Sequence, residues 1–392
     1  MSTPSQEQFR AEVRAWLEGH APTKGSPDDF SSVHVVSAST IDEYRRREHD
    51  AFMRTCAWQR TLFDAGYAGR SWAVEYGGHG QPAWQDDVIA EEQSRFGVST
   101  KMLAIALEML PPVLFAHGTH EQRERYLPAV VRGEQSWCQL LSEPNAGSDL
   151  GSATTFATKV PGGWSVTGQK VWTSGAGSSD YALLVARTDR EVAGRAGLSC
   201  FAMAMAQPGV EVRPLHQMSG GYHFNEVFLD EVFVDESDLI GTVGGGWAVL
   251  RTMLASERSA IGGGTSARAA QQLIALAVAQ GVNHDPNVRQ MLATAVTRER
   301  LLDLVQARAA ATGAVPAAGS VSKLLYSEHA RLTSSAGMEL LGAAGMASDS
   351  AMAEQWHERF LFAPGLRLGG GTDEIQRNII GEQGLGLPRE PR

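Results

Sequence analysis

The sequence predicts an α+β protein of several domains, with helices at both ends and strands in the middle. Three observations carry this prediction. Apolar residues recur at helical spacing from the start to about Gly133, short runs rich in Val, Thr, Phe and Trp follow as far as Ile240, and long Ala- and Leu-rich segments fill the remainder. We therefore expect an N-terminal all-α domain at 1–133, a middle β domain at 134–240 and a C-terminal helical domain at 241–392.

The N-terminal domain repeats the helical pattern several times. Segments 103–114 and 121–131 both have it. Thr119 is suited to cap the second of these helices, because its hydroxyl can accept a hydrogen bond from a free N–H group of the first turn. A loop rich in Pro and Gly follows the first helix. The apolar face of that helix consists of Phe9, Val13, Trp16 and Leu17.

The middle domain consists of short strands separated by glycine-rich turns. The turn Pro161-Gly162-Gly163 predicts that Trp164–Thr167 is the returning strand of a hairpin. Phe224–Leu229 has the alternation of a half-exposed strand. No G-x-G-x-x-G segment follows a strand here, which weighs against NAD as the cofactor.

The C-terminal domain returns to helical periodicity after three consecutive glycines at 244–246. Its long Ala- and Leu-rich segments suggest an antiparallel bundle. The predicted helices cover roughly 247–280, 285–312, 317–341, 349–360 and 372–382.

The composition argues against several classes of function. The 392 residues carry a net charge of −10, whereas binding to nucleic acid or to an anionic membrane surface requires a basic face. The three cysteines, Cys56, Cys138 and Cys200, lack metal-binding spacing and indicate reduced, intracellular thiols. The sequence shows no signal peptide and no apolar run of membrane-spanning length, so we expect a cytoplasmic protein.

The segment Cys138–Asp149 reads C-Q-L-L-S-E-P-N-A-G-S-D and predicts a strand that runs into a tight turn. The small residues Ala146, Gly147 and Ser148 allow backbone N–H groups to approach an anion closely, as a pyrophosphate cradle requires. Asn145 suits this turn, because asparagine tolerates a positive φ better than other non-glycine residues. A common polar surface turn is the alternative interpretation.

Two further segments extend the pattern. Trp172-Thr173-Ser174 ends a predicted strand, and Gly369–Glu382 reads G-G-G-T-D-E-I-Q-R-N-I-I-G-E. Together with the first motif, these segments resemble the flavin-binding signature and the C-terminal active-site segment of the acyl-CoA dehydrogenase family. The similarity extends through almost all of the chain.

This resemblance implies a fold and an activity. The fold would place a middle β-barrel between two helical domains, with a C-terminal four-helix bundle that builds a tetramer. The activity would be FAD-dependent dehydrogenation of an acyl-CoA thioester to the trans-2-enoyl-CoA, with an electron-transferring flavoprotein as the acceptor.

The resemblance also assigns residues by matching position. Trp172 would pack against the flavin ring, Ser174 would hydrogen-bond near flavin N5, and Glu339 replaces the family's Gln beside the pyrophosphate. The implied flavin-binding residues are Gln139, Leu141, Ser142, Gly147, Ser148, Trp172, Thr173, Ser174, Glu339, Gly342, Thr372 and Glu374. The implied substrate-binding residues are Ser148, Arg258 and Gly371.

The catalytic base of many family members is absent here, because its place before Gly-Thr is Gly370. Other members, including the isovaleryl and long-chain types, carry the base in a Glu-Arg pair on a helix, and this chain has Glu257-Arg258. Leu250, Leu254, Glu257 and Ile261 are spaced four, three and four, which independently places Glu257 on an apolar stripe.

We therefore predict Glu257 as the base that removes the α-proton, since desolvation strengthens a carboxylate as a base. In the alternative, Glu257 turns outward and pairs with Arg251, Arg258 or Arg300. Gly370 can still contribute catalytically, because the resemblance implies that its backbone N–H and the flavin ribityl hydroxyl hold the thioester oxygen. A plain flexible loop is the alternative for the three glycines.

A missing motif bears on assembly. In the family an R-x-Q-F-G segment follows the Glu-Arg helix, and its Arg grips the flavin of a neighbouring subunit, but Leu273–Pro286 contains neither Arg nor Phe-Gly. We expect either an α2β2 heterotetramer with a related subunit that supplies this contact, or a homotetramer in which another residue replaces the Arg. The closest resemblance is to actinobacterial members that act on bulky, steroid-derived acyl-CoA esters.

Two competing functions stay open at this point. The first is an acyl-CoA oxidase or flavin monooxygenase on the same fold, which would let O2 reach the reduced flavin. The second is a non-catalytic partner subunit, favoured by Gly370, Glu339 and the missing Arg. The intact motifs around Ser142 and Trp172, together with Glu257, argue against the second.

Overall fold

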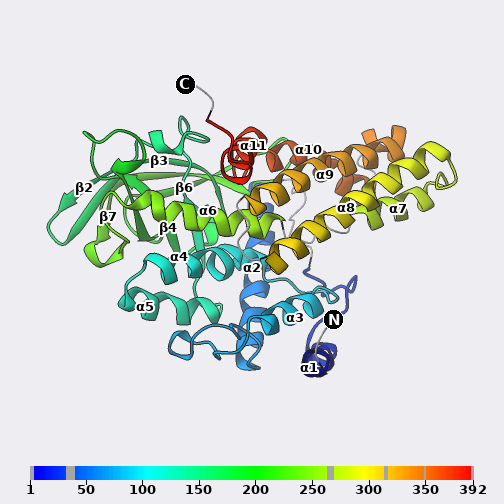
Figure 1. Ribbon diagram of the computed structural model, residues 1–392, viewed down its shortest axis with the longest axis horizontal. Helices are drawn as coiled ribbons and strands as arrows, with labels where there is room; N and C mark the ends of the chain where they lie inside the picture. The colour runs from blue at the N-terminus through cyan, green and yellow to red at the C-terminus, as the bar shows by residue number, and fades with distance from the viewer. Residues whose placement is uncertain (1–3, 32–39, 263–268, 313–316, 348–349, 390–392) are drawn as a thin grey trace. The chain divides into compact units, whose positions relative to one another are not determined.

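The computed structural model describes residues 4–31, 40–262, 269–312, 317–347 and 350–389. Helices occupy both ends of the chain and strands the middle (Figure 1), as the sequence predicts. The chain forms two compact units. The first comprises the residues up to His216 together with Tyr222–Met253, and the second comprises Gln217–Gly221 together with the residues from Leu254 onward.

The N-terminal helices pack around an aromatic and aliphatic core that includes Val13, Leu17 and Trp58. The predicted helix at 103–114 is divided into a 3₁₀ turn, a π-helical turn at Ile105–Met109 and then α4. Pro111 and Pro112 explain the irregularity, because a proline has no N–H group to donate to the preceding turn. The helices are α1 (Pro4–His20), α2 (Ile41–Asp64), α3 (Trp84–Gln93), α4 (Leu110–His117) and α5 (His120–Val131).

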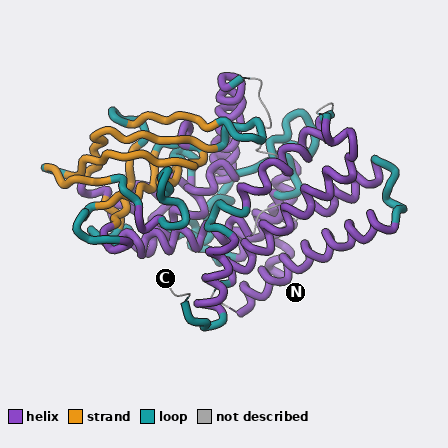
Figure 2. Tube along the Cα trace, turned by 90° about the horizontal axis from the view of Figure 1, so that it is seen from above, coloured by secondary structure: helices purple, strands orange, loops and turns teal. Residues whose placement is uncertain are grey.

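The middle region forms one eight-stranded sheet with the order β6-β7-β3-β2-β4-β5-β8, in which β1 pairs with β4 in parallel. Figure 2 shows these strands grouped together. The pairs β2–β3, β3–β7, β4–β5 and β6–β7 are antiparallel. The strands are β1 (Trp137–Leu140), β2 (Phe156–Val160), β3 (Gly163–Ser174), β4 (Tyr181–Arg187), β5 (Leu198–Ala204), β6 (Val210–Leu215), β7 (Phe224–Asp235) and β8 (Leu239–Ile240).

The predicted hairpin and the predicted alternating strand are both confirmed. β2 and β3 meet at Val160 and Gly163, and Gly162 between them has a φ of 79°, a conformation that glycine adopts readily. Side chains at the start of β7 alternate between half-buried and buried, so one face packs on the core. β3 is bulged between Val166 and Gly168 and again between Lys170 and Thr173.

α5 is bound to the end of the sheet through polar side chains. Gln122 Nε2 donates to the carbonyl oxygens of Ser237 and Leu239 at 2.7 and 2.8 Å. The Tyr126 hydroxyl donates to Asp238 Oδ1 at 2.6 Å. The predicted cap is confirmed, because Thr119 and Gln122 form a reciprocal capping box.

In the C-terminal helices, α9 contacts α7, α8, α10 and α11. Their core includes Leu273, Leu340 and Trp356. The predicted segment 247–280 covers two described helices, α6 and α7, and residues 263–268 lie outside the described residues. The helices are α6 (Gly246–Gly262), α7 (Ala269–Ala279), α8 (Pro286–Thr312), α9 (Ala318–Leu341), α10 (Ala351–Leu366) and α11 (Asp373–Ile379).

The helical, sheet and helical regions confirm the predicted fold class, whereas the exact domain boundaries stay predictions. No helix among the described residues is long and apolar enough to cross a membrane.

Candidate active site

The first two sequence motifs meet in the sheet unit. The chain leaves β1 at Leu140, and the carbonyl oxygen of Ser142 accepts a hydrogen bond from the N–H of Val171 in β3 at 2.9 Å. This bond places the loop after β1 alongside the end of β3, immediately before Trp172. Two segments that the sequence presents separately therefore form one surface.

The turn within the first motif differs from the expectation for Asn145. Glu143 and Ala146 exchange two backbone hydrogen bonds of 3.1 Å, which close a turn over Pro144 and Asn145. Among the described residues, positive φ occurs in only three non-glycine residues, and Asn145 is not one of them. The expectation of a positive φ at Asn145 is wrong, because the closed turn does not require a left-handed residue there.

A buried ion pair holds this loop against β3. Lys170 Nζ lies 2.8 Å from Glu143 Oε1 and donates to the carbonyl oxygen of Leu141 at 3.0 Å, and the two charged side chains are 0% and 4% exposed. Glu143 also accepts from the backbone N–H groups of Thr154 and Thr155. Burial alone would raise the pKa of Glu143, but Lys170 and these donors hold it at about 2. Sequence reasoning missed the pair, although Glu143 lies within the first motif and Lys170 is two residues before Trp172.

Trp172 occupies an unusual position at the end of β3. Its φ is 63° at the bulge between Lys170 and Thr173, and its indole is 60% exposed. Phe224 on the neighbouring strand meets the indole edge to face, with ring centroids 6.0 Å apart. A bulge can redirect a side chain, and strained residues are concentrated at functional sites.

The other predicted flavin-binding residues of this unit differ in exposure and in hydrogen bonding. The Thr173 hydroxyl is buried and has no hydrogen-bond partner among the described residues, whereas Ser174 is exposed. Gln139 is half-buried and donates to Met109 Sδ at 3.3 Å, and Leu141 is 9% exposed. A flat aromatic ligand with polar edges fits an exposed indole beside an unsatisfied hydroxyl, so these residues suit a flavin.

Two of the three small residues of the first motif are open to solvent, whereas Ala146 is 2% exposed and donates its N–H to the carbonyl oxygen of Glu143. Gly147 and Ser148 are exposed, and a Cβ added at Gly147 would meet no atom within 4 Å. This part of the loop therefore leaves room for a bulky anionic group, as the predicted pyrophosphate contact requires.

Glu257 lies on α6 in the second unit, where it is half-buried. Burial raises the pKa of its carboxyl, and the charges of Arg258 and Lys323, which act in the opposite direction, do not cancel this effect. Among the described residues the Glu257 side chain forms no ion pair, so the alternative of a surface pair with Arg251, Arg258 or Arg300 is not realised there.

The neighbours of Glu257 on its helix are partly as predicted. Leu250 is buried and Leu254 is half-buried, so the apolar stripe is present, while the Ile261 side chain lies outside the described residues. Arg258 lies beside the first turn of α9, because a Cβ added at Gly319 would be 3.4 Å from Arg258 Cβ.

The three-glycine segment between α10 and α11 adopts left-handed backbone conformations. Gly370 and Gly371 have φ values of 67° and 90°. Gln376 Nε2 donates to the carbonyl oxygens of Gly370 and Gly371 at 2.7 and 3.3 Å. A Cβ added at Gly371 would lie 2.6 Å from that nitrogen, so close approach and φ together require glycine.

The other C-terminal candidates either follow this segment in the chain or lie at the C-terminal end of α9. The Thr372 hydroxyl caps α11 by accepting from the N–H of Ile375 at 3.2 Å, and Glu374 is exposed at 3.8 Å from Arg377. Glu339 is exposed near the end of α9, and Gly342 ends that helix with a φ of 55°. Their contacts with a flavin stay predictions.

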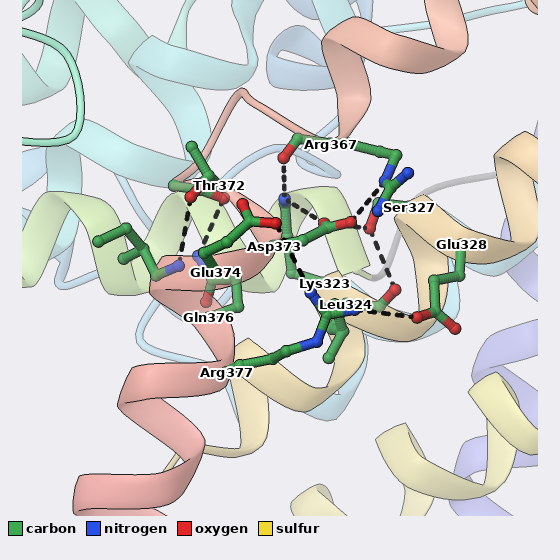
Figure 3. Close-up of polar contacts among 12 residues, drawn as sticks. Lys323, Leu324, Ser327, Glu328, Arg367, Thr372, Asp373, Glu374, Gln376 and Arg377 are labelled. Atoms are coloured by element: carbon green, nitrogen blue, oxygen red, sulfur yellow. Dashed lines mark hydrogen bonds and ion pairs between the residues drawn. The ribbon is translucent and has the colours of Figure 1, made fainter. Parts of the chain in front are cut away.

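A buried charge cluster beneath the glycine segment was not predicted (Figure 3). Asp373 is 1% exposed. Its carboxylate accepts hydrogen bonds from Arg367 Nε at 2.5 Å, from the Ser327 hydroxyl at 2.9 Å and from Lys323 Nζ at 3.4 Å. Burial would raise the pKa of Asp373, but these donors lower it. Asp373 is therefore a poor candidate for the base, although it lies near Gly370, the position at which the resemblance places the base of many family members.

The predicted site residues are divided between the two units. The residues at 139–148 and 172–174 belong to the first, and Glu257, Arg258 and the residues from Glu339 to Glu374 belong to the second. Each unit therefore presents one part of the predicted chemistry: a flavin-compatible surface in the first, and a carboxylate with a glycine segment in the second.

Three family models cover nearly the whole chain. They are the acyl-CoA dehydrogenase N-terminal domain at residues 3–134, the middle domain at 138–232 and the C-terminal domain at 244–385.

Curated relatives and solved structures agree with these matches. The chain is 36% identical to the acyl-CoA dehydrogenase IpdE1 of Mycolicibacterium smegmatis, over 98% of both chains. It is 38% identical to the acyl-CoA dehydrogenase FadE34 of Mycobacterium tuberculosis over 84% of this chain and 46% of the relative. A steroid ACAD, Tcur3481-Tcur3483, superposes with a TM-score of 0.81 at 27% identity, covering 100% and 99% of the two chains. The ChsE4-ChsE5 complex of Mycobacterium tuberculosis gives 0.78 at 26% identity, with the same coverage.

Proposed function

We propose a function from one premise: the chain belongs to the acyl-CoA dehydrogenase family, and it is an acyl-CoA dehydrogenase. The proposal is that the chain removes one hydrogen each from the α- and β-carbons of an acyl-CoA thioester, giving the trans-2-enoyl-CoA. Glu257 takes the α-hydrogen as a proton. The observation that carries this role is a half-buried carboxylate with a raised pKa that has no ion-pair partner among the described residues.

The chemistry of Glu257 follows from its surroundings. Proton abstraction breaks the bond between the α-carbon and its hydrogen and leaves the proton on a carboxylate oxygen of Glu257. A carboxylate with a raised pKa is a stronger base than one in water, so burial favours the transfer. The charges of Arg258 and Lys323 act in the opposite direction and favour the ionised form of the carboxyl.

Bound FAD would supply the acceptor for the β-hydrogen, which leaves as hydride and so completes the new double bond. Trp172 would lie against the flavin ring, and Ser142, Thr173 and Ser174 would hydrogen-bond its polar edge. The support for this placement is the exposed indole beside the unsatisfied Thr173 hydroxyl. Gly147 and Ser148 would leave space for the pyrophosphate. The further flavin contacts that we propose are Gln139, Leu141, Glu339, Gly342, Thr372 and Glu374.

The glycine segment would polarise the substrate. Negative charge develops on the thioester oxygen when the α-proton leaves, and preorganised backbone N–H groups stabilise such a charge. Gly370 and Gly371 are the proposed source of these groups. Arg258 and Ser148 would contact the CoA part of the substrate.

The substrate class that we propose is a bulky acyl-CoA, such as a steroid-derived or branched ester. One structural relative at 27% identity is described as a steroid ACAD, which supports this choice. A straight-chain acyl-CoA is the alternative, and a substrate panel distinguishes them.

The partners proposed are a related subunit in an α2β2 heterotetramer and an electron-transferring flavoprotein. The segment Leu273–Pro286 lacks the Arg that the family uses toward a neighbouring flavin, and one solved relative is described as a complex of two named chains. An oxidase is the second candidate function. Oxygen consumption that accompanies turnover would favour it, whereas dye reduction without oxygen consumption favours the dehydrogenase.

The test is the anaerobic visible spectrum of the purified protein with straight, branched and steroid-side-chain acyl-CoAs. Wild type should bleach at the flavin maximum, and Glu257→Gln should retain its flavin but bleach about 10²- to 10⁴-fold more slowly. The wild-type rate should fall as the pH drops through the raised pKa of Glu257, because only the ionised carboxylate accepts a proton.

A matched control is Glu236→Gln, which removes an exposed carboxylate that pairs only with Lys159 among the described residues. It should bleach like wild type. Equal bleaching in Glu257→Gln would assign the base to another residue, and a wild type that stays colourless both alone and together with a related subunit would overturn the flavin itself.

A further inference from the structure

Three consecutive glycines form a flexible segment unless the surrounding structure restrains them, because glycine loses more backbone entropy on ordering than any other residue. The segment 369–371 is restrained in this protein. The N–H of Gly369 donates to the carbonyl oxygen of Gly365 at 2.9 Å, and Gln376 Nε2 donates to the carbonyl oxygens of Gly370 and Gly371. Gly365 and Gln376, which lie on either side of the segment in the chain, therefore hold its backbone in place.

The N–H groups of Gly370 and Gly371 are available for a ligand. Neither makes a backbone hydrogen bond among the described residues. The oxygen and hydrogen of a planar trans peptide point in opposite directions, so Gln376, which holds the carbonyl of Gly370, turns the N–H of Gly371 away from itself. Because the carbonyl group of Gly370 is held in place, the direction of the Gly371 N–H group is also fixed.

Asp373 closes a ring around this segment (Figure 3). Its N–H donates to the carbonyl oxygen of Arg367 at 3.1 Å, and its carboxylate accepts from Arg367 Nε at 2.5 Å. Residues 368–372 are therefore bracketed by two bonds between the same pair of residues. The two ends of this stretch are therefore held together, which limits the conformations open to the residues between them.

α9 anchors the ring to the helical core. Ser327 donates to Asp373 Oδ1 at 2.9 Å, and Lys323, whose side chain is 0% exposed, donates to the Arg367 carbonyl oxygen and to Asp373 Oδ1, both at 3.4 Å. Asp373 is thus bonded to three residues, two of them from α9. A buried carboxylate with several donors has one favoured position, because each alternative leaves a charge unpaired.

We propose that Asp373 is a positioning residue for the acyl-CoA dehydrogenation, because it holds the Gly369–Gly371 segment in the conformation that aims its backbone N–H groups at the thioester oxygen. This inference rests on the proposed function. Asp373 touches neither the substrate nor the proposed base, and it acts only through the glycine segment. Its neighbour Lys323 is also one of the two charges that act on Glu257, so the cluster lies close to the proposed base as well.

The experiment compares Asp373→Asn and Arg367→Gln with wild type, each in the flavin-loaded assembly that the protein forms. Asp373→Asn keeps the shape and removes the charge. Arg367→Gln removes only the bond to Oδ2 and changes a partly exposed side chain, so it tests the ring even if Asp373→Asn does not fold. The control is Asp303→Asn, which removes an exposed carboxylate that pairs with Arg300 in α8.

Three quantities are measured for each protein: the rate of flavin reduction, the apparent Kd of the acyl-CoA, and the red shift of a bound chromophoric 2-enoyl-CoA, which reports polarisation of its carbonyl. We expect Asp373→Asn to slow reduction by about ten- to hundredfold, as displaced or lost oxyanion donors do, with a smaller effect in Arg367→Gln. The apparent Kd should change less than threefold, and the red shift should shrink.

The outcomes separate the two proposals. If no acyl-CoA reduces the wild-type flavin, the proposed function fails and the positioning role fails with it. If wild type is reduced and both variants match Asp303→Asn in rate and red shift, only the positioning role is overturned. A slower rate with an unchanged red shift would also overturn it, because the loss would then not come from carbonyl polarisation.

Discussion

At the scale of single residues, Lys170 and Glu143 determine where the flavin-compatible surface forms. Lys170 is two residues before Trp172, and Glu143 follows Ser142 directly. Their ion pair therefore joins both halves of the surface. Burial lowers the pKa of Lys170, while Glu143 opposes that effect and stabilises the charged form. Neither residue needs to touch a cofactor to matter for its binding.

Replacing Lys170 by Met should destabilise the protein by about 3–5 kcal/mol, because it leaves the buried Glu143 carboxylate without its cation. The measurement is the midpoint of urea unfolding. Lys159→Met is the control, since Lys159 and its partner Glu236 are 48% and 68% exposed, and the loss there should be about 1 kcal/mol or less. Equal losses in the two variants would contradict a structural role for the buried pair.

At the scale of elements, a local signal predicted α5 and its start correctly. Thr119 and Gln122 satisfy each other's backbone N–H groups at 3.2 and 3.0 Å, and Gln122 also reaches the end of the sheet with its amide nitrogen. The capping box thus determines where α5 begins, and its Gln122 attaches the helix to the turn at Ser237 and to β8.

Thr119→Ala should lower stability by about 1 kcal/mol, since one N–H group of the first turn loses its acceptor. Urea unfolding or hydrogen exchange of α5 measures the effect. Thr61→Ala removes a hydroxyl that donates within α2 to Ala57, and it should be neutral or slightly stabilising because alanine is the better helix former. Equal destabilisation by the two variants would show that the cap contributes nothing specific.

The elements also show how far sequence reasoning reaches. Periodicity and turn residues predicted α1, α5, the helices from α8 to α11, the β2–β3 hairpin and β7, because these depend on neighbours in the chain. α2 and α3 were not predicted individually, and the segment 103–114 is divided rather than one helix. The pair of Lys170 with Glu143 spans 27 residues and that of Lys323 with Asp373 spans 50, and no local pattern encodes such contacts. The motifs identified Trp172 and Glu257 as candidates. The contacts that fix the glycine segment could be found only in the structure.

At the scale of the whole molecule, exposed apolar side chains on α7 and α8 bear on the proposed partner subunit. Large apolar residues on α7 and α8 are between 37% and 57% exposed, which is more than solvated helices need. They are Ile274, Val278, Val296, Leu301 and Leu304. The segment Leu273–Pro286, where the family's Arg is absent, runs from within α7 to the first residue of α8. The apolar surface and the missing Arg both favour a partner subunit.

The heterotetramer predicts that this chain, purified alone, binds less than one FAD per chain and does not form a stable tetramer. Light scattering behind a sizing column gives the mass, and the ratio of flavin to protein absorbance gives the occupancy. Addition of the partner subunit should raise both. A tetramer of this chain alone with one tightly bound FAD per chain would eliminate the heteromer in favour of the homotetramer.

At Trp172, selection for folding stability and selection for flavin binding should favour different residues. A left-handed backbone conformation costs a non-glycine residue roughly 1–2 kcal/mol, and Trp172 has a φ of 63° with an indole that recovers little by burial. A library of variants screened only for heat resistance of the colourless protein should therefore enrich glycine at this position. The same library screened for yellow colour should retain tryptophan, and the divergence between the two pools would record how much folding stability the chain gives up to hold a ligand.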